Sequence, residues 1–169
     1  TLLHNVLPEP APAPEINAVR IALYQPDIPQ NAGAILRLAA CLNIPVDLIE
    51  PAGFVLHSQG VRRAGMDYLE QADLSRHISW DAFEAGVTPP QRLILLSTKA
   101  TERHIDFDYH RDDTLLVGRE SDGVPQSVHA RADAQVRVPM QADARSLNVV
   151  TALALVLGEA LRQQDGFPG

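Results

Sequence analysis

Short, continuously apolar runs constrain the fold of this chain more than any other feature of its sequence. Such runs predict strands at 19–25, 45–51, 92–99, 113–118 and 134–140, and helical spacing or turn-bounded pieces between them predict helices at 34–43, 79–86, 124–132 and 146–164. A short helix or loop followed by a small strand is expected after residue 59. Parallel strands covered on both faces are apolar throughout, whereas half-exposed strands alternate. The sequence therefore predicts an α/β fold with a mostly parallel sheet and helices on both faces.

The length of 169 residues suits a single domain, which we expect to span 19–169. Residues 1–18 hold four alternating prolines, which favour an extended proline-rich arm rather than a packed element. The single cysteine, Cys41, excludes an internal disulfide, and its place after an apolar run predicts a core position. No run is long enough to cross a bilayer and no signal-like segment opens the chain, so a cytoplasmic protein is expected.

The last predicted helix is apolar almost all round between residues 149 and 157. A helix of this kind has to be buried on two sides. One side is expected to pack on the sheet and the other on a second copy of the chain, which predicts a homodimer.

The formal net charge of −7 argues against indiscriminate binding to nucleic acid, which needs a basic surface, but it leaves room for a local basic patch. Candidates for such a patch are Arg37, Arg62, Arg63, Lys99, Arg103, Arg119 and Arg145. The six histidines have no H-E-x-x-H or C-x-x-C companions, so no metal site is expected. Dinucleotide, P-loop and G-x-S-x-G hydrolase motifs do not occur either.

Two late strands run into loops of small and polar residues, which is how α/β proteins build ligand sites at the carboxyl ends of their strands. In the first loop, Gly118 and Gly123 would let a ligand lie against backbone, with Glu120 between them. In the second, Ser146 and Asn148 stand at the start of the last helix, where free N–H groups bind polar groups. Simple capping by Ser146 is the alternative.

A third polar piece, PQNAGAILR, follows the first strand. Asn31 is expected to cap the helix there, Gly33 to allow close approach of backbone, and Arg37 to emerge about a turn later. When this piece is taken alone, a capped helix with a solvated arginine is the favoured interpretation.

Taken together, the pieces resemble the three motifs of the SPOUT RNA methyltransferases, in their TrmH-like branch. The resemblance covers about residues 19–169 and rests on LYQPDIPQNAGAILRLAA, IEPAGF, RRAGMDY, RLILLSTK, GRESDGVP and RVPM…RSLN. It is strongest to the minimal members of that branch, which methylate the ribose 2'-hydroxyl of the wobble cytidine or uridine of tRNA.

The resemblance implies a C-terminal deep trefoil knot, S-adenosylmethionine as the cofactor, a homodimer formed through the last helix, and tRNA, with leucine tRNAs expected, as the partner. By motif, it assigns cofactor contacts to Leu96, Gly118, Glu120, Val138, Ser146 and Leu147, the catalytic role to Arg37, and motif positions to Asn31, Gly33, Gly123 and Asn148. Arg62, Arg63 and Arg145 are the candidates for RNA contacts. Gly158 departs from the branch, whose members usually have a tyrosine there.

Two alternatives remain at this point. One is a 2'-O-methyltransferase of the same branch that modifies another tRNA nucleotide or a ribosomal RNA. The other is a non-catalytic RNA-binding protein that kept the fold.

Overall fold

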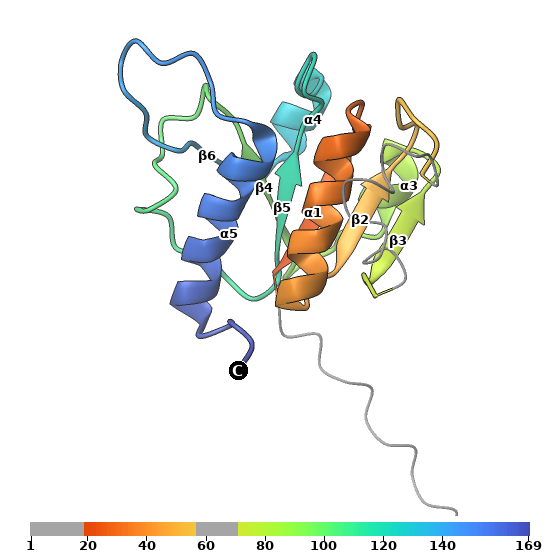
Figure 1. The fold of residues 1–169 in the computed structure, drawn as a ribbon, viewed down its shortest axis with the longest axis horizontal. Coiled ribbons are helices and arrows are strands. Elements are labelled where there is room, and N and C mark those ends of the chain that lie inside the picture. The colour runs from red at the N-terminus through yellow and green to blue at the C-terminus, as the bar shows by residue number, and fades with distance from the viewer. Residues whose placement is uncertain (1–18, 57–70) are drawn as a thin grey trace, which may run out of the picture.

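The computed structural model describes residues 19–56 and 71–169, and it has strands and helices alternating along the chain (Figure 1). In chain order they are β1 (Arg20–Tyr24), α1 (Pro29–Leu42), β2 (Val46–Ile49), β3 (Leu74–His77), α3 (Trp80–Ala85), β4 (Arg92–Leu96), β5 (Asp113–Val117), α4 (Gln126–Arg131), β6 (Ala134–Val136) and α5 (Val149–Gln164). The strands of this part of the chain form one sheet in the order β3-β2-β1-β5-β4-β6, and every neighbouring pair is parallel. The predicted α/β architecture is confirmed.

The two faces of the sheet are covered by different helices. In β1, Ile21 and Leu23 pack into the cluster that contains α1 and α5, whereas Ala22 and Tyr24 pack into the cluster that contains α3 and α4. Figure 1 shows α1 and α5 beside each other on one face. Burial on both faces explains why the strands are apolar throughout rather than alternating.

Two buried carboxylates interrupt the apolar strands, and both are paired. Asp113 of β5 accepts hydrogen bonds from Nε and Nη2 of Arg92, each at 2.7 Å. Asp47 of β2 is 5% exposed, and its carboxylate accepts a hydrogen bond from Arg20 Nε at 3.0 Å and contacts His77 Nε2 at 2.8 Å. A buried carboxylate is tolerated when such partners replace water.

Helix α1 begins five residues earlier than expected, at Pro29. Proline suits the first turn of a helix because its missing N–H would have no partner there. The N-cap is Ile28, which makes no side-chain capping bond, and Asn43 ends the helix in a left-handed conformation. The prediction that Asn31 caps this helix is therefore wrong, because Asn31 lies inside the first turn and its side chain is used elsewhere.

Helix α5 begins at Val149, three residues later than predicted, and its N-cap is Asn148 rather than Ser146. The Asn148 side chain accepts hydrogen bonds from the backbone N–H groups of Val150 and Thr151. The short helix α3 is capped by Ser79, whose hydroxyl accepts a hydrogen bond from Ala82 N at 3.1 Å.

Cys41 is exposed, so the prediction that it lies in the core is wrong. The buried side of α1 carries Ile35, Leu36 and Ala39, and Cys41 falls on the opposite side of the helix despite its apolar neighbours. The proline-rich arm and the helix or loop expected after residue 59 lie outside the described residues.

Strand β6 is only three residues long because the chain leaves the sheet after Val136. Beyond this point it runs beside the loop that follows β4: Ser97 N donates to Val136 O, His104 N donates to Arg137 O, and Arg137 N donates to Glu102 O, at 2.8 to 2.9 Å. This close passage of two segments fits the knotted C-terminal part that the family resemblance implies. In the part of the chain that is described, no helix is long and apolar enough to cross a membrane.

Candidate functional site

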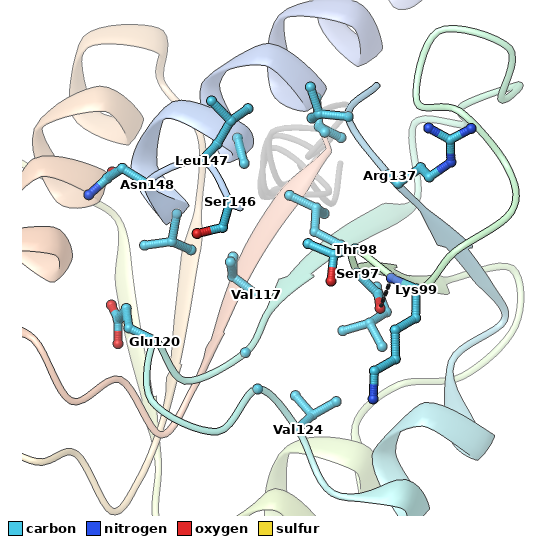
Figure 2. A pocket seen from close by; sticks show the side chains of 18 of the residues that line it. Ser97, Thr98, Lys99, Val117, Glu120, Val124, Arg137, Ser146, Leu147 and Asn148 are labelled. Carbon is cyan, nitrogen blue, oxygen red and sulfur yellow. Dashed lines mark hydrogen bonds between the residues drawn. The ribbon is translucent and has the colours of Figure 1, made fainter. Parts of the chain in front are cut away.

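The carboxyl ends of β4, β5 and β6 meet the N-terminus of α5 around a cavity of about 700 Å³ (Figure 2). This volume lies in the range of small-molecule sites, roughly 300–1,000 Å³. The strand ends and the loops after them supply the lining, which includes Leu96, Ser97, Thr98, Lys99, Val117, Gly118, Glu120, Val138, Ser146, Leu147 and Asn148.

All six residues predicted to contact the cofactor line this one cavity. They come from three separate segments: Leu96 ends β4, Gly118 and Glu120 follow β5, and Val138, Ser146 and Leu147 lie between β6 and α5. Figure 2 shows Glu120 and Asn148 on one side of the cavity and Lys99 across from them. The walls are therefore mixed, with aliphatic side chains and backbone along the strand ends and polar side chains at the edges.

The loop after β5 is folded tightly on itself. Arg119 and Gly123 exchange backbone hydrogen bonds at 3.0 and 2.8 Å, and Gly123 has a φ of +65°, where glycine is favoured. A Cβ at Gly118 would lie 2.8 Å from the carbonyl carbon of Gly123. Glycine is needed at Gly118 for the loop to close, and the bare backbone it leaves forms part of the cavity wall.

A chain of hydrogen bonds joins the three motif segments at the cavity edge. Asn31 Nδ2 donates to Glu120 Oε1 at 3.3 Å, and Asn148 Nδ2 donates to Asn31 Oδ1 at 3.2 Å. Because Asn148 also caps α5, the network fixes the start of that helix relative to α1. Asn31 thus links segments instead of capping its own helix.

Glu120 has an unusual electrostatic environment. Burial, and then the hydrogen bond to Asp27, raise the pKa of its carboxyl group above the ordinary value. Groups with displaced pKa values in a cavity are candidates for function.

The remaining predicted residues are divided between the cavity and other parts of the molecule. Arg37 is exposed on α1 and is not among the cavity-lining residues, and Arg145 is exposed in the segment that precedes α5. Gly33 is buried within α1, and Gly123 lines the cavity together with Asn31 and Asn148. Arg62 and Arg63 lie outside the described residues.

Three residues after β4 were not among the predicted contacts. Ser97, Thr98 and Lys99 line the cavity, and the Ser97 hydroxyl accepts from Lys99 N at 3.2 Å. Their sequence signal is the same as that of Gly118: polar residues that follow directly on a buried parallel strand. No group of three or more His, Cys, Asp or Glu side chains is placed to hold a metal ion within 19–56 and 71–169.

The residues present fit S-adenosylmethionine on structural grounds. The cavity is large enough for it, the aliphatic side chains of Leu96, Val138 and Leu147 offer an apolar surface to an adenine ring, and the bare backbone at Gly118 permits close approach. Polar edges at Glu120 and Ser146 can orient its polar groups.

Comparison with known proteins agrees with this geometry. The model of the SpoU rRNA Methylase family matches residues 18–158. A tRNA (cytidine(34)-2'-O)-methyltransferase of Beijerinckia indica is 58% identical over 144 residues, which cover 85% of this chain and 90% of the relative.

Two solved structures are also similar. One, on the 2-OH methylation of C/U34 on tRNA, has a TM-score of 0.83 and 38% identity and covers 89% of this chain and 99% of that one. The SpoU methyltransferase AviRb from Streptomyces viridochromogenes, in complex with AdoMet, has a TM-score of 0.78 and 25% identity and covers 88% of this chain and 61% of that one. The chain belongs to the SpoU rRNA Methylase family.

Proposed function

We propose that this protein transfers a methyl group from S-adenosylmethionine to the ribose 2'-hydroxyl of the wobble cytidine or uridine, nucleotide 34, of tRNA. The observation that carries the proposal is the cavity, which gathers the six predicted cofactor contacts from three segments at one end of the sheet. The Beijerinckia indica relative and the structure on C/U34 methylation support the substrate.

The cofactor supplies an electrophilic methyl group when it is bound, so the protein's own task is to align a weak hydroxyl nucleophile and assist loss of its proton. The apolar wall and the bare backbone at Gly118 hold the cofactor, while Glu120 and Asn148 fix the edge of the cavity. A preformed cavity wall would hold the methyl group aligned with the ribose 2'-hydroxyl that attacks it.

Arg37 is the proposed catalytic residue, acting as an orienting and electrostatic group rather than as a base. A guanidinium group stays protonated in proteins, so it is a poor acceptor for the proton of the hydroxyl group. The substrate phosphate or a water molecule takes the proton instead. Arg62, Arg63 and Arg145 are the proposed contacts to tRNA phosphates.

The active form is proposed to be a homodimer with α5 in the interface. On α5, Leu153, Val156 and Leu157 are buried against the sheet, whereas Leu155 on another side is 46% exposed. A Cβ at Gly158 would have no atom within 4 Å, so a partner helix has room to approach closely there. Residues 19–169 are the proposed catalytic domain, with residues 1–18 as an appended arm, and the cytoplasm is the proposed place of action.

Methyl transfer from labelled S-adenosylmethionine to bulk tRNA tests the proposal. The tRNA comes from a strain in which the gene for this protein has been deleted, so that its target nucleotide is unmodified. We expect label at nucleotide 34 and none in tRNA from the parent strain. Label at another tRNA nucleotide would mean that the protein modifies a different position, and cofactor binding without any transfer would favour the non-catalytic alternative.

A further inference from the structure

Asp27, in the loop between β1 and α1, binds three consecutive residues of the loop after β5. Its Oδ1 accepts from Glu120 N at 3.2 Å, its Oδ2 accepts from the Ser121 hydroxyl, and Arg119 Nη2 lies 3.7 Å from Oδ2. The contact is reciprocal, because Asp27 N donates to Glu120 Oε2 at 3.3 Å. Asp27 and Glu120, 93 positions apart in the sequence, are thus joined by two hydrogen bonds, in each of which the carboxyl group of one accepts from the backbone N–H of the other.

The carboxyl groups of Asp27 and Glu120 have pKa values that are displaced in opposite directions. Hydrogen bonds from Glu120 and Ser121 lower the pKa of Asp27 to about 2, whereas burial and the bond to Asp27 raise the pKa of Glu120. Two adjacent carboxylates repel each other, so the pair takes up its first proton on one of them. In this pair Asp27 keeps its charge beside Arg119, and Glu120 is the member that accepts the proton.

A third loop packs on the same residue. Gly53, after β2, donates its N–H to Pro26 O at 2.9 Å, and a Cβ at Gly53 would lie 3.0 Å from the Cα and the Cβ of Asp27. Asp27 is therefore held from two sides, although it is not itself among the residues that line the cavity.

Asp27 affects the cavity through Glu120, which lines it. Glu120 accepts from Asn31, and Asn31 accepts from Asn148 at the start of α5. A displacement of Glu120 would loosen this whole edge of the cavity.

We propose that Asp27 is a positioning residue of the methyl-transfer site, which fixes the place of the Glu120 carboxyl group and, through it, Asn31 and Asn148. The inference rests on the proposed function for its kinetic part. Its cofactor-binding part does not depend on which RNA is the substrate.

The test compares Asp27→Ala, Asp27→Asn and Gly53→Ala with the wild-type chain. Asp81→Asn, at an exposed position of the first turn of α3, is the control. Each protein is measured for the dissociation constant of S-adenosylmethionine by calorimetry from pH 5 to 9, for kcat and KM with tRNA over the same range, and for its thermal unfolding midpoint.

Asp27→Ala is expected to lower kcat by about 10- to 100-fold, because misplacing a reacting group by ~1 Å costs up to about that much. The KM for tRNA should change little. Gly53→Ala should reduce kcat less, with no displacement of the pH profile, because it pushes Asp27 but keeps its charge.

Asp27→Asn separates the charge of Asp27 from its shape. Asparagine is close in shape to aspartate but removes the neighbouring negative charge, so the pKa of Glu120 should fall. The pH midpoint that Glu120 imposes on cofactor affinity, and on kcat/KM, should therefore move to lower pH. Asp81→Asn should behave as wild type.

Wild-type kcat in Asp27→Ala would overturn the inference. So would an Asp27→Asn variant with a lower unfolding midpoint but unchanged pH profiles for cofactor binding and kcat/KM, because Asp27 would then be only a structural tie. If the wild-type chain binds S-adenosylmethionine but methylates no tRNA, the proposed function fails, and the pH profile of cofactor binding still decides the role of Asp27.

Discussion

Gly118 shows how one side chain, or its absence, decides whether the cavity forms. The gap between Gly118 and Gly123 leaves no room for a Cβ, which would lie 2.8 Å from backbone carbon. Contacts that short force the backbone to move, and this backbone is part of the cavity wall.

We therefore expect Gly118→Ala to weaken S-adenosylmethionine binding by about tenfold or more. A tenfold loss corresponds to ~1.4 kcal/mol of binding free energy. Calorimetry on the purified variant measures it. Gly86→Ala is the matched control, because a Cβ at Gly86 would lie 3.6 Å from its nearest atom, an ordinary contact. Equal cofactor affinity in the two variants would contradict the account of this wall.

Arg37→Lys separates the shape of the guanidinium from its charge. Lysine keeps the positive charge but not the planar fork that binds two oxygens at once. We expect kcat to fall roughly 100-fold, the size seen when one preorganised donor is lost from an active site. Cofactor affinity should stay unchanged, because Arg37 does not line the cavity. Single-turnover methyl transfer measures the effect, and near-wild-type turnover would exclude a role for the fork.

Individual residues also mark what the sequence could and could not predict. Small and polar residues in the loop after a buried strand, or at the start of a helix, are a local signal. This signal pointed to Gly118 and Glu120 after β5 and to Ser146 before α5, and all three line one cavity. Contacts between residues far apart in the chain carry no such signal, so the bonds from Asn31 to Glu120 and Asn148 were not foreseen. Asp27, an acidic residue in a proline-flanked loop after β1, was missed for the same reason.

Helix α5 has an apolar side that no other part of the described structure covers. Leu153, Val156, Leu157, Ala160 and Leu161 are buried on one side of the helix, and the side with Leu155 and Gly158 is open. The apolar sequence around the helix predicted burial on two sides, and a second copy of the chain would provide the other side.

Leu155→Glu should therefore convert a dimer into monomers. Placing a carboxylate in an apolar interface without a partner costs several kcal/mol, which is enough to dissociate most dimers at micromolar concentration. Sedimentation equilibrium measures the mass directly. Phe167→Glu, which changes a similarly exposed apolar residue beyond α5, should leave the dimer intact. A wild-type chain that is monomeric at every concentration would contradict the proposed interface.

The ends of the helices were harder to predict than their existence. The sequence predicts that the first helix begins at residue 34, whereas α1 begins at Pro29. Ser146 and Asn148 are two polar residues near the predicted start of the last helix. Side-chain geometry decides between them: the Asn148 side chain reaches two backbone N–H groups, and Ser146 faces the cavity instead. Cys41 follows an apolar run in the sequence, but it lies on the side of α1 opposite the buried residues, so its apolar neighbours do not predict its burial.

The chain as a whole is acidic, with a formal net charge of −7, so its affinity for tRNA has to come from a local cluster of cations. We expect Arg145→Glu to weaken tRNA binding and to reduce the slope of log affinity against log salt by about 1. Cofactor affinity should not change. Arg111→Glu, before β5 and so at the opposite edge of the sheet, is the control. A filter-binding titration over several salt concentrations measures both, and equal losses from the two variants would mean that net charge alone governs binding.

The central claim is methylation of the ribose at nucleotide 34, and one comparison tests it most directly. Two tRNA transcripts, identical except for ribose or 2'-deoxyribose at nucleotide 34, are incubated with the protein and labelled S-adenosylmethionine. We expect one methyl group per molecule on the ribose transcript and none on the deoxy transcript. Equal labelling of the two, or labelling of neither by a protein that binds the cofactor and the tRNA, would contradict it.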